Sequence, residues 1–384
     1  MPKYIQADQF FYPYGIRQGG YLELVDGKFG KWTKAIPADA EVIDYRGYSI
    51  APGLVDTHIH GFGGVDVMDN NIEGTLHTMS EGLLSTGVTS FLPTTLTSTF
   101  ESLLAVTENI GAHYQEATGA KIRGLYFEGP YFTEKYKGAQ NPIYMKNPRM
   151  DEFRAWKKAS NGLLNKIALA PEREGVEDFV RTITDEGVTV ALGHSNATFD
   201  EAKVAVDAGA SVWVHAYNGM RGLTHRELGM VGAMYELPHT YAELICDGHH
   251  VDPKACDILM KQKGHEHIAL ITDCMTAGGL EDGDYMLGEF PVVVENGTAR
   301  LKSTGNLAGS ILKLKDGLKN VVKWGIANAH QAVMMATLNP AKSVHIEDVC
   351  GQIKEGHDAD FIVLDKDLEL VATYLDGEKR YEAK

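Results

Sequence analysis

Six residues whose side chains can bind a metal ion stand at or near the ends of short apolar runs. They are His58 and His60 in LVDTHIH, Glu128 in GLYFEGP, His194 in VALGHSNA, His215 in VWVHAYNGM and Asp273 in ALITDCM. Side chains alternate between the faces of a strand, so His58 and His60 would point the same way. Histidine and carboxylate are typical ligands of a catalytic zinc or iron site. Ligands spread over more than 200 residues require a fold that gathers strand ends together.

The middle of the chain alternates between apolar, strand-like runs and helix-like segments. The eight runs cover about 53–60, 87–96, 122–128, 167–172, 188–194, 211–215, 242–247 and 268–273. The clearest helical segments are 101–115, 175–185, 198–208 and 252–261. Near-continuous apolar runs are typical of buried parallel strands. Eight strand–helix units that close on themselves form an α/β fold of the (β/α)8, TIM-like barrel type. Its active site lies at the carboxyl ends of the strands, where all six candidate ligands fall.

Both ends of the chain have a different character, with short strands and tight turns. Asp26-Gly27 and Asp376-Gly377 are hairpin signals within these ends. We therefore predict one small sheet domain from residues 1–51 and 344–384, and a catalytic barrel from residues 52–343.

The barrel pattern changes after Asp273. Residues 280–303 are predicted to form a hairpin over the barrel mouth, with Asn296-Gly297 at its turn. A helix is expected from about 310 to 324. A second helix is expected to begin near residue 328 and to stop at Asn339-Pro340, because proline disrupts a helix interior.

The net charge limits the classes of partner that we expect, and the cysteine spacing bears on the cellular location. The formal net charge is -16, which argues against nucleic acid or an anionic membrane but permits a small anionic substrate. No signal-like segment or run of eighteen apolar residues is found. The four cysteines show no CxxC spacing, so reduced thiols and a cytoplasmic location are expected.

Several short motifs carry a resemblance to a known family. PGLVDTHIHG at 52–61 is similar to the first-strand signature of the amidohydrolase superfamily. Within it, the chain resembles the N-acetylglucosamine-6-phosphate deacetylase family. The narrower motifs are FEGPY (127–131), KGAQNP (137–142), LAPE (169–172), GHSNAT (193–198), VHAYNGM (214–220), CDGHHVDP (246–253), TDCMTAGG (272–279), LAGS (307–310) and NPAK (339–342).

The resemblance implies a barrel with a small β-sandwich built from both termini. It also implies hydrolysis of N-acetyl-D-glucosamine 6-phosphate to D-glucosamine 6-phosphate and acetate. Members of the family are typically homodimers in which the neighbouring subunit helps to complete the phosphate site.

The resemblance also assigns roles to the metal-capable residues. Glu128, His194 and His215 match a principal metal site, and His58 with His60 matches a second site that some members have. We expect one or two divalent metal ions per subunit, with zinc or iron favoured, although manganese and cobalt also suit these ligands. Asp273 matches the superfamily's proton-handling aspartate, and it is also a candidate ligand.

Five further residues are candidate substrate-binding residues by resemblance: Gln140, Asn218, Gly219, Arg226 and His250. Arg226, Asn218 and Gly219 match positions that meet the sugar phosphate, and a guanidinium suits phosphate geometry. His250 matches the substrate-binding histidine, with the adjacent His249 as the alternative. Gln140 stands where some relatives have histidine, and Leu228 where many have proline. A glutamine amide can still donate a hydrogen bond to the acetyl carbonyl, but it cannot become cationic.

Two other functions are alternative interpretations of this sequence. A relative acting on N-acyl-amino acids or cyclic amides would share the chemistry, but it would need a site for an α-carboxylate rather than a phosphate. A non-catalytic scaffold is disfavoured because all six candidate ligands are present. Cys274, beside Asp273, is expected to face the other side of its strand and to pack rather than react.

Overall fold

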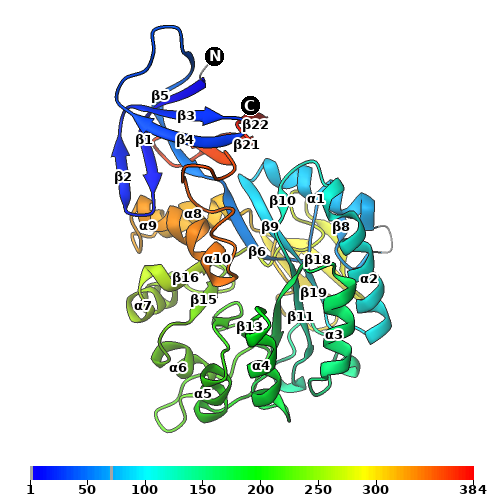
Figure 1. The fold of residues 1–384 in the computed structure, drawn as a ribbon. Coiled ribbons are helices and arrows are strands. Elements are labelled where there is room, and N and C mark those ends of the chain that lie inside the picture. The colour runs from blue at the N-terminus through cyan, green and yellow to red at the C-terminus, as the bar shows by residue number, and fades with distance from the viewer. Residues whose placement is uncertain (1–2, 70–71) are drawn as a thin grey trace.

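The computed structural model describes residues 3–69 and 72–384. The two ends of the chain lie together in one sheet beside the barrel (Figure 1). Its strands are β1 (Lys3–Tyr12), β2 (Gly15–Gln18), β3 (Tyr21–Val25), β4 (Lys28–Thr33), β5 (Glu41–Pro52), β20 (Phe361–Leu364), β21 (Leu370–Leu375) and β22 (Glu378–Glu382). The strands of the expected β-sandwich are hydrogen-bonded in one continuous sheet. Strands from both ends of the chain share one apolar core, in which the rings of Phe29 and Phe361 pack together. The two predicted turns, at 26–27 and 376–377, join β3 to β4 and β21 to β22.

Eight parallel strands form the predicted barrel. They are β6 (Leu54–Ile59), β9 (Val88–Thr95), β11 (Leu125–Tyr131), β12 (Leu164–Leu169), β13 (Thr189–Leu192), β14 (Val212–Trp213), β15 (Tyr241–Leu244) and β16 (Ile268–Leu270). The backbone N–H of Asp273 donates to the carbonyl of His58 (2.9 Å), which joins the end of the last strand to the first. This contact brings two candidate ligands from opposite ends of the barrel domain together.

A helix follows each strand and covers the outside of the barrel (Figure 1). These helices are α1 (Ile72–Leu84), α2 (Phe100–His113), α3 (Met150–Ala159), α4 (Val176–Asp185), α5 (Phe199–Asp207), α6 (Gly229–Glu236), α7 (Pro253–Lys263), α8 (Leu314–Lys323), α9 (Ala329–Ala336) and α10 (Leu338–Ser343). Short strands β7 (Gly61–Phe62), β8 (Val65–Asp66) and β10 (Lys121–Ile122) lie in the connections. Threonine and asparagine caps fix several starts; Thr198, for example, forms a capping box with Glu201.

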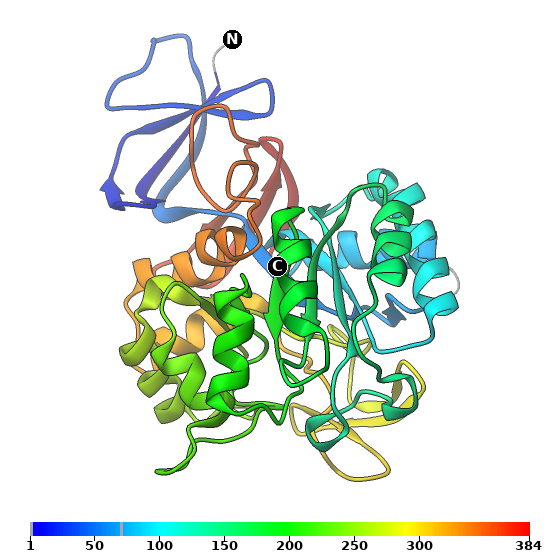
Figure 2. The same cartoon turned by 60° about the horizontal axis from the view of Figure 1, so that its bottom comes forward.

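The segment after the last barrel strand is more elaborate than the predicted hairpin. It forms three strands, β17 (Gly283–Leu287), β18 (Phe290–Glu295) and β19 (Thr298–Leu301), with the predicted 296–297 turn between the last two. Their apolar side chains pack with Leu96 and Met275. Figure 2 shows this segment in yellow next to the loop that follows β11.

Two helix boundaries differ from the prediction. The helix expected from 310 begins at Leu314, because the backbone of Ser310 is paired with Asp273 at the strand end. The next helix breaks at Thr337 (φ -133°, ψ -81°) rather than at Pro340. Pro340 lies in the first turn of α10, where no intrahelical hydrogen bond from its nitrogen is required.

Candidate metal and active site

The six predicted ligands converge at the carboxyl ends of the barrel strands. All six are buried, and none is more than 8% exposed. They form two groups of three, within each of which the possible ligand atoms lie within 4.8 Å of one another. One group is Glu128, His194 and His215, and the other is His58, His60 and Asp273.

Glu128 lies between the two groups. Its Oε1 is 3.2 Å from His194 Nε2 and 3.1 Å from His215 Nε2. Its other oxygen, Oε2, is 3.3 Å from His60 Nε2. Asp273 Oδ1 lies 3.2 Å from His60 Nε2 and 3.5 Å from His58 Nε2. A single carboxylate therefore reaches both sets of histidines.

The contacts of the outer nitrogen, Nδ1, show which ring nitrogen of each histidine carries a hydrogen. Nδ1 of His194 donates to the carbonyl of Tyr136 (2.9 Å), and Nδ1 of His215 donates to the carbonyl of Asn218 (3.0 Å). In the neutral form of such a ring the lone pair is on Nε2, and the two Nε2 atoms are only 3.0 Å apart. Two lone pairs at that separation, facing carboxylates, repel unless a cation lies among them. The donor set therefore fits a bound divalent metal.

The same pattern holds for the second histidine pair. Nδ1 of His60 donates to the carbonyl of Thr94 (3.1 Å), and Nδ1 of His58 is 3.2 Å from Glu243 Oε2. The inner nitrogens of His58 and His60 are 3.3 Å apart. This group thus offers a second cation position beside the first.

Charge in the site favours ionised carboxylates. Burial raises the pKa of Glu128, but His58 and hydrogen bonds from the other histidines outweigh burial and hold it well below its usual range. Burial lowers the pKa of His60, yet its contacts with Asp273 and Glu128 leave it well above the ordinary value. The surroundings therefore attract positive charge, as protons or as metal ions.

Backbone conformation at the strand ends aims these side chains inward. His194, His215 and Asp273 have positive φ values of 44°, 27° and 51°. This region is costly for residues with a Cβ, so it occurs where the surrounding structure enforces it, often at functional sites. Gly219 (φ 61°) also lies close by, and a Cβ there would be 2.9 Å from Nδ1 of His194.

A buried ion pair under the metal-capable residues was missed by the sequence analysis. Lys166 on β12 and Glu243 on β15 are fully buried and bonded to each other. Nζ of Lys166 also donates to the carbonyl of Thr57 (3.2 Å) and lies 3.7 Å from the ring centre of Tyr126. Burial raises the pKa of Glu243, but Lys166 and His58 lower it to about 2. The signal was present, because each is a charged residue inside an otherwise apolar run.

A cavity of about 410 Å³, here called the metal cavity, opens above the ligands. Predicted substrate residues Gln140, Asn218, Gly219 and His250 line it, and His249 does not. Nδ1 of His250 lies 2.6 Å from Asp247 Oδ2, which fixes the orientation of the ring.

The side chain of Gln140 is buried; its Nε2 donates to Glu128, and its Oε1 accepts from the backbone N–H of Thr97 (2.8 Å). Lys135 is a further lining residue that the sequence analysis did not select.

Arg226 is the one predicted substrate residue that does not line the metal cavity. It is exposed on the loop before α6, where Leu223 and Leu228 are also exposed.

Cys274 is buried in the core as expected, and burial raises the pKa of its thiol. No helix among the described residues is long and apolar enough to cross a membrane.

Comparison with known proteins agrees with this geometry. The N-acetylglucosamine-6-phosphate deacetylase of Vibrio furnissii is 40% identical over 345 residues, covering 90% of this chain and 86% of the relative. The N-acetylgalactosamine-6-phosphate deacetylase of Escherichia coli O157:H7 is 38% identical, covering 89% and 90%. A solved mutant of N-acetyl-D-glucosamine-6-phosphate deacetylase from Mycobacterium smegmatis, in complex with N-acetyl-D-glucosamine-6-phosphate, is 29% identical. It matches with a TM-score of 0.92 over 99% of both chains.

Residues 49–380 match the sequence pattern of the Amidohydrolase family. With the barrel, the inward-facing ligands and relatives matched over most of their length, this shows that the chain belongs to the amidohydrolase family.

Proposed function

We propose that this protein hydrolyses the acetamide bond of N-acetyl-D-glucosamine 6-phosphate, giving D-glucosamine 6-phosphate and acetate. The convergence of four histidine Nε2 atoms on Glu128 and Asp273 carries the proposal. Relatives that bear the name of this deacetylase, including one of 40% identity, support the choice of substrate. Acyl-amino acids and cyclic amides are the weaker alternative, because no relative described above is named for them.

A bound divalent metal lowers the pKa of water and polarises a carbonyl, which are the two things an amide hydrolysis needs first. Glu128, His194 and His215 would hold one ion, and His58, His60 and Asp273 a second, with Glu128 reaching both. We propose zinc or iron, which these ligands suit. Replacing His58 with Gln and His60 with Asn should lower the metal content by one equivalent per chain; an unchanged content would leave a single-metal site.

Asp273 would act as the proton carrier. Burial raises its pKa, but His58 and His60 outweigh this effect and keep the pKa below the ordinary value, so the carboxylate is ionised. It would take a proton from the attacking water and deliver it to the departing nitrogen. Gln140 has one N–H committed to Glu128, and its second N–H can meet the acyl carbonyl.

The sugar phosphate would lie toward Asn218, Gly219 and His250. Arg226 does not line the metal cavity of its own chain. We therefore propose a homodimer in which Arg226 of one subunit reaches the phosphate bound to the other. The four buried, unpaired cysteines suit a reducing compartment, which supports a cytoplasmic location.

The galactose epimer is the second candidate substrate. Relatives named N-acetylgalactosamine-6-phosphate deacetylase are 38% and 33% identical to this chain. The two sugars differ only in the configuration of the hydroxyl at C4, the ring carbon next to the one that carries the phosphorylated C6.

The test is acetate release from three compounds: both N-acetylhexosamine 6-phosphates and unphosphorylated N-acetylglucosamine. We expect the glucosamine phosphate to be the best substrate and removal of the phosphate to lower kcat/KM by at least about a hundredfold, as expected from two lost charge-assisted hydrogen bonds. A preference for the galactosamine phosphate would reassign the epimer. No release from any of them would contradict the proposal.

A further inference from the structure

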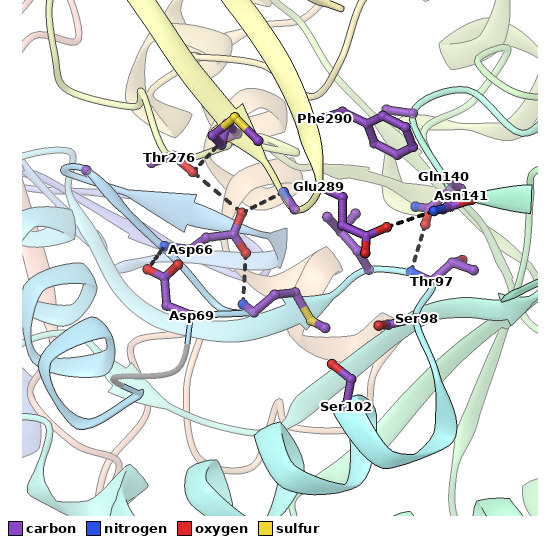
Figure 3. A pocket seen from close by; sticks show the side chains of 16 residues that line it. Asp66, Asp69, Thr97, Ser98, Ser102, Gln140, Asn141, Thr276, Glu289 and Phe290 are labelled. Atoms are coloured by element: carbon purple, nitrogen blue, oxygen red, sulfur yellow. Dashed lines mark hydrogen bonds between the residues drawn. The ribbon is translucent and has the colours of Figure 1, made fainter. Parts of the chain in front are cut away.

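A second cavity, of about 430 Å³, lies next to the metal cavity. We call it the rear chamber. The two spaces share three lining residues, Leu96, Ala139 and Gln140. The other described residues that line the rear chamber are Gly64, Asp66, Met68, Asp69, Thr97, Ser98, Ser102, Asn141, Thr276, Met286, Gly288, Glu289 and Phe290. Figure 3 shows Asp66 and Asp69 on one side and Gln140, Asn141 and Glu289 on the other.

The shared wall is made of one polar and two apolar side chains. Leu96 is 7% exposed and packs with the apolar side chains of β17–β19. It lies so near the β17–β18 turn that a Cβ on Gly288 would be 2.9 Å from its Cδ1. Gln140 links the two spaces, because it bonds Glu128 on one side and the backbone of Thr97 on the other.

The wall lies on the acyl side of the metal cavity. Asn218, Gly219 and His250, which would meet the sugar phosphate, line the metal cavity but not the rear chamber. Gln140 is placed to meet the acyl carbonyl. An amide held between the sugar site and Gln140 therefore directs the remaining substituent of its acyl carbon toward Leu96 and Ala139.

We propose that the rear chamber is an acyl subsite, into which N-acyl chains longer than acetyl extend past Leu96. The proposal rests on the deacetylase function given above. The hydrolysis itself is unchanged: the water oxygen bonds to the acyl carbon, the C–N bond breaks, and the nitrogen takes a proton. With a butanoyl group the products are butanoate and the amino-sugar phosphate.

The lining also predicts which acyl chains are refused. Asp66, Asp69 and Glu289 bring negative charge, and no lysine or arginine occurs among the chamber residues that the structure describes. Asp66 is largely buried and accepts a hydrogen bond from the backbone N–H of Met68 (2.8 Å). Met68, Met286 and Phe290 supply apolar surface. Neutral chains should enter, whereas a chain ending in a carboxylate should be repelled.

The experiment compares kcat/KM for the N-acetyl, N-butanoyl and N-succinyl derivatives of glucosamine 6-phosphate. For the native protein we expect the butanoyl compound to be hydrolysed within about tenfold of the acetyl compound, and the succinyl compound at least about a hundredfold more slowly than the butanoyl compound. Leu96→Ala should raise the butanoyl-to-acetyl ratio about tenfold, because it shortens a side chain that separates the two spaces.

Two further variants make the test specific. Leu287→Ala removes the same atoms from the same apolar cluster, but Leu287 lines only the metal cavity, so the ratio should stay within about twofold of the native value. Ser102→Trp should lower the ratio, because Ser102 lines only the rear chamber and an indole would fill it.

The outcomes separate the two proposals. A ratio that changes with neither Leu96→Ala nor Ser102→Trp, or that changes equally with Leu287→Ala, would overturn the acyl subsite while acetate release still upheld the deacetylase. Failure of the native protein to hydrolyse the acetyl compound would instead overturn the proposed function.

Discussion

Histidine orientation in this site depends on residues that touch no substrate. His58 is held through Nδ1 by Glu243, which is in turn paired with Lys166 in the fully buried centre of the barrel. An acceptor on the outer nitrogen fixes which ring nitrogen faces the metal, and loss of such a partner typically costs 10–100-fold in metal affinity. Lys166 and Glu243 would therefore act as positioning residues for the proposed second metal position.

Glu243→Gln should weaken that position selectively. Its amide has one acceptor for the two donors, Lys166 and His58, so one of them must face the new NH2 group. We expect about one metal equivalent to be bound 10–100-fold more weakly, measured by metal analysis after dialysis against graded chelator. Asp360→Asn changes a buried carboxylate in the sheet domain and should leave metal content unchanged. Native affinity for both ions in Glu243→Gln would refute the positioning role.

Asp273→Asn should separate binding from turnover. The amide keeps the shape of the carboxylate but cannot carry the proton, so kcat should fall by about 10²–10⁴. Calorimetric titration should show that the sugar phosphate still binds within a few fold of the native affinity, and the Glu128 group should keep its metal. Near-native kcat would show that another group carries the proton.

At the level of elements, the sequence was informative where a single physical rule applied. Buried parallel strands read as apolar runs, so β6 and β16 were found together with His58, His60 and Asp273 at their ends. The proline rule failed at Pro340, because a helix can restart just before a proline that then lies in its first turn. The rear chamber could not be predicted, because it is built from five separate segments that meet only in the folded chain.

Charged side chains join the barrel to the sheet domain. Nζ of Lys121, on β10, lies 2.8 Å from Asp358, and a guanidinium nitrogen of Arg123 lies 2.6 Å from the same carboxylate. Burial raises the pKa of Asp358, but hydrogen bonds from Lys121, Lys28 and Arg123 prevail and hold it well below its usual range. A carboxylate with a depressed pKa stabilises the fold above its unfolded pKa, and this contribution is lost as pH falls through the folded value.

Asp358→Asn should therefore lower the free energy of unfolding at pH 7. We expect a loss of roughly 1 kcal/mol, because the carboxylate is partly exposed and solvent screens its interactions. The difference from the native protein should shrink below about pH 4, near the unfolded pKa of aspartate, in urea unfolding curves. Asp44→Asn, at an exposed pair with Arg46, is the control and should change little. A deficit that persists undiminished at low pH would contradict an ionic origin.

At the level of the whole molecule, the metal cavity of a single chain is not lined by Arg226, the arginine predicted to meet the phosphate. Sequence resemblance predicts that Arg226 is a phosphate ligand, but the position of a loop relative to a second subunit cannot be read from one chain. Its exposure beside Leu223 and Leu228 is what a residue at a subunit contact would show.

Mixing two inactive variants tests this arrangement. Arg226→Ala and Asp273→Asn would each be nearly inactive at low substrate. If Arg226 acts across the dimer, random mixed dimers contain one complete site, and activity should return to about a quarter of the native level. If Arg226 serves its own subunit, both sites in every mixed dimer are damaged and no activity returns. Sedimentation of the native protein as a monomer would also exclude the dimer.

We propose that a divalent metal, held by these six buried side chains, drives hydrolysis of an amino-sugar phosphate. The most direct measurement is acetate release from N-acetyl-D-glucosamine 6-phosphate, before chelation, after chelation and after return of zinc or iron, with bound metal counted in the same samples. We expect activity to fall with the metal and to return with it. Undiminished acetate release from metal-free protein would contradict the account.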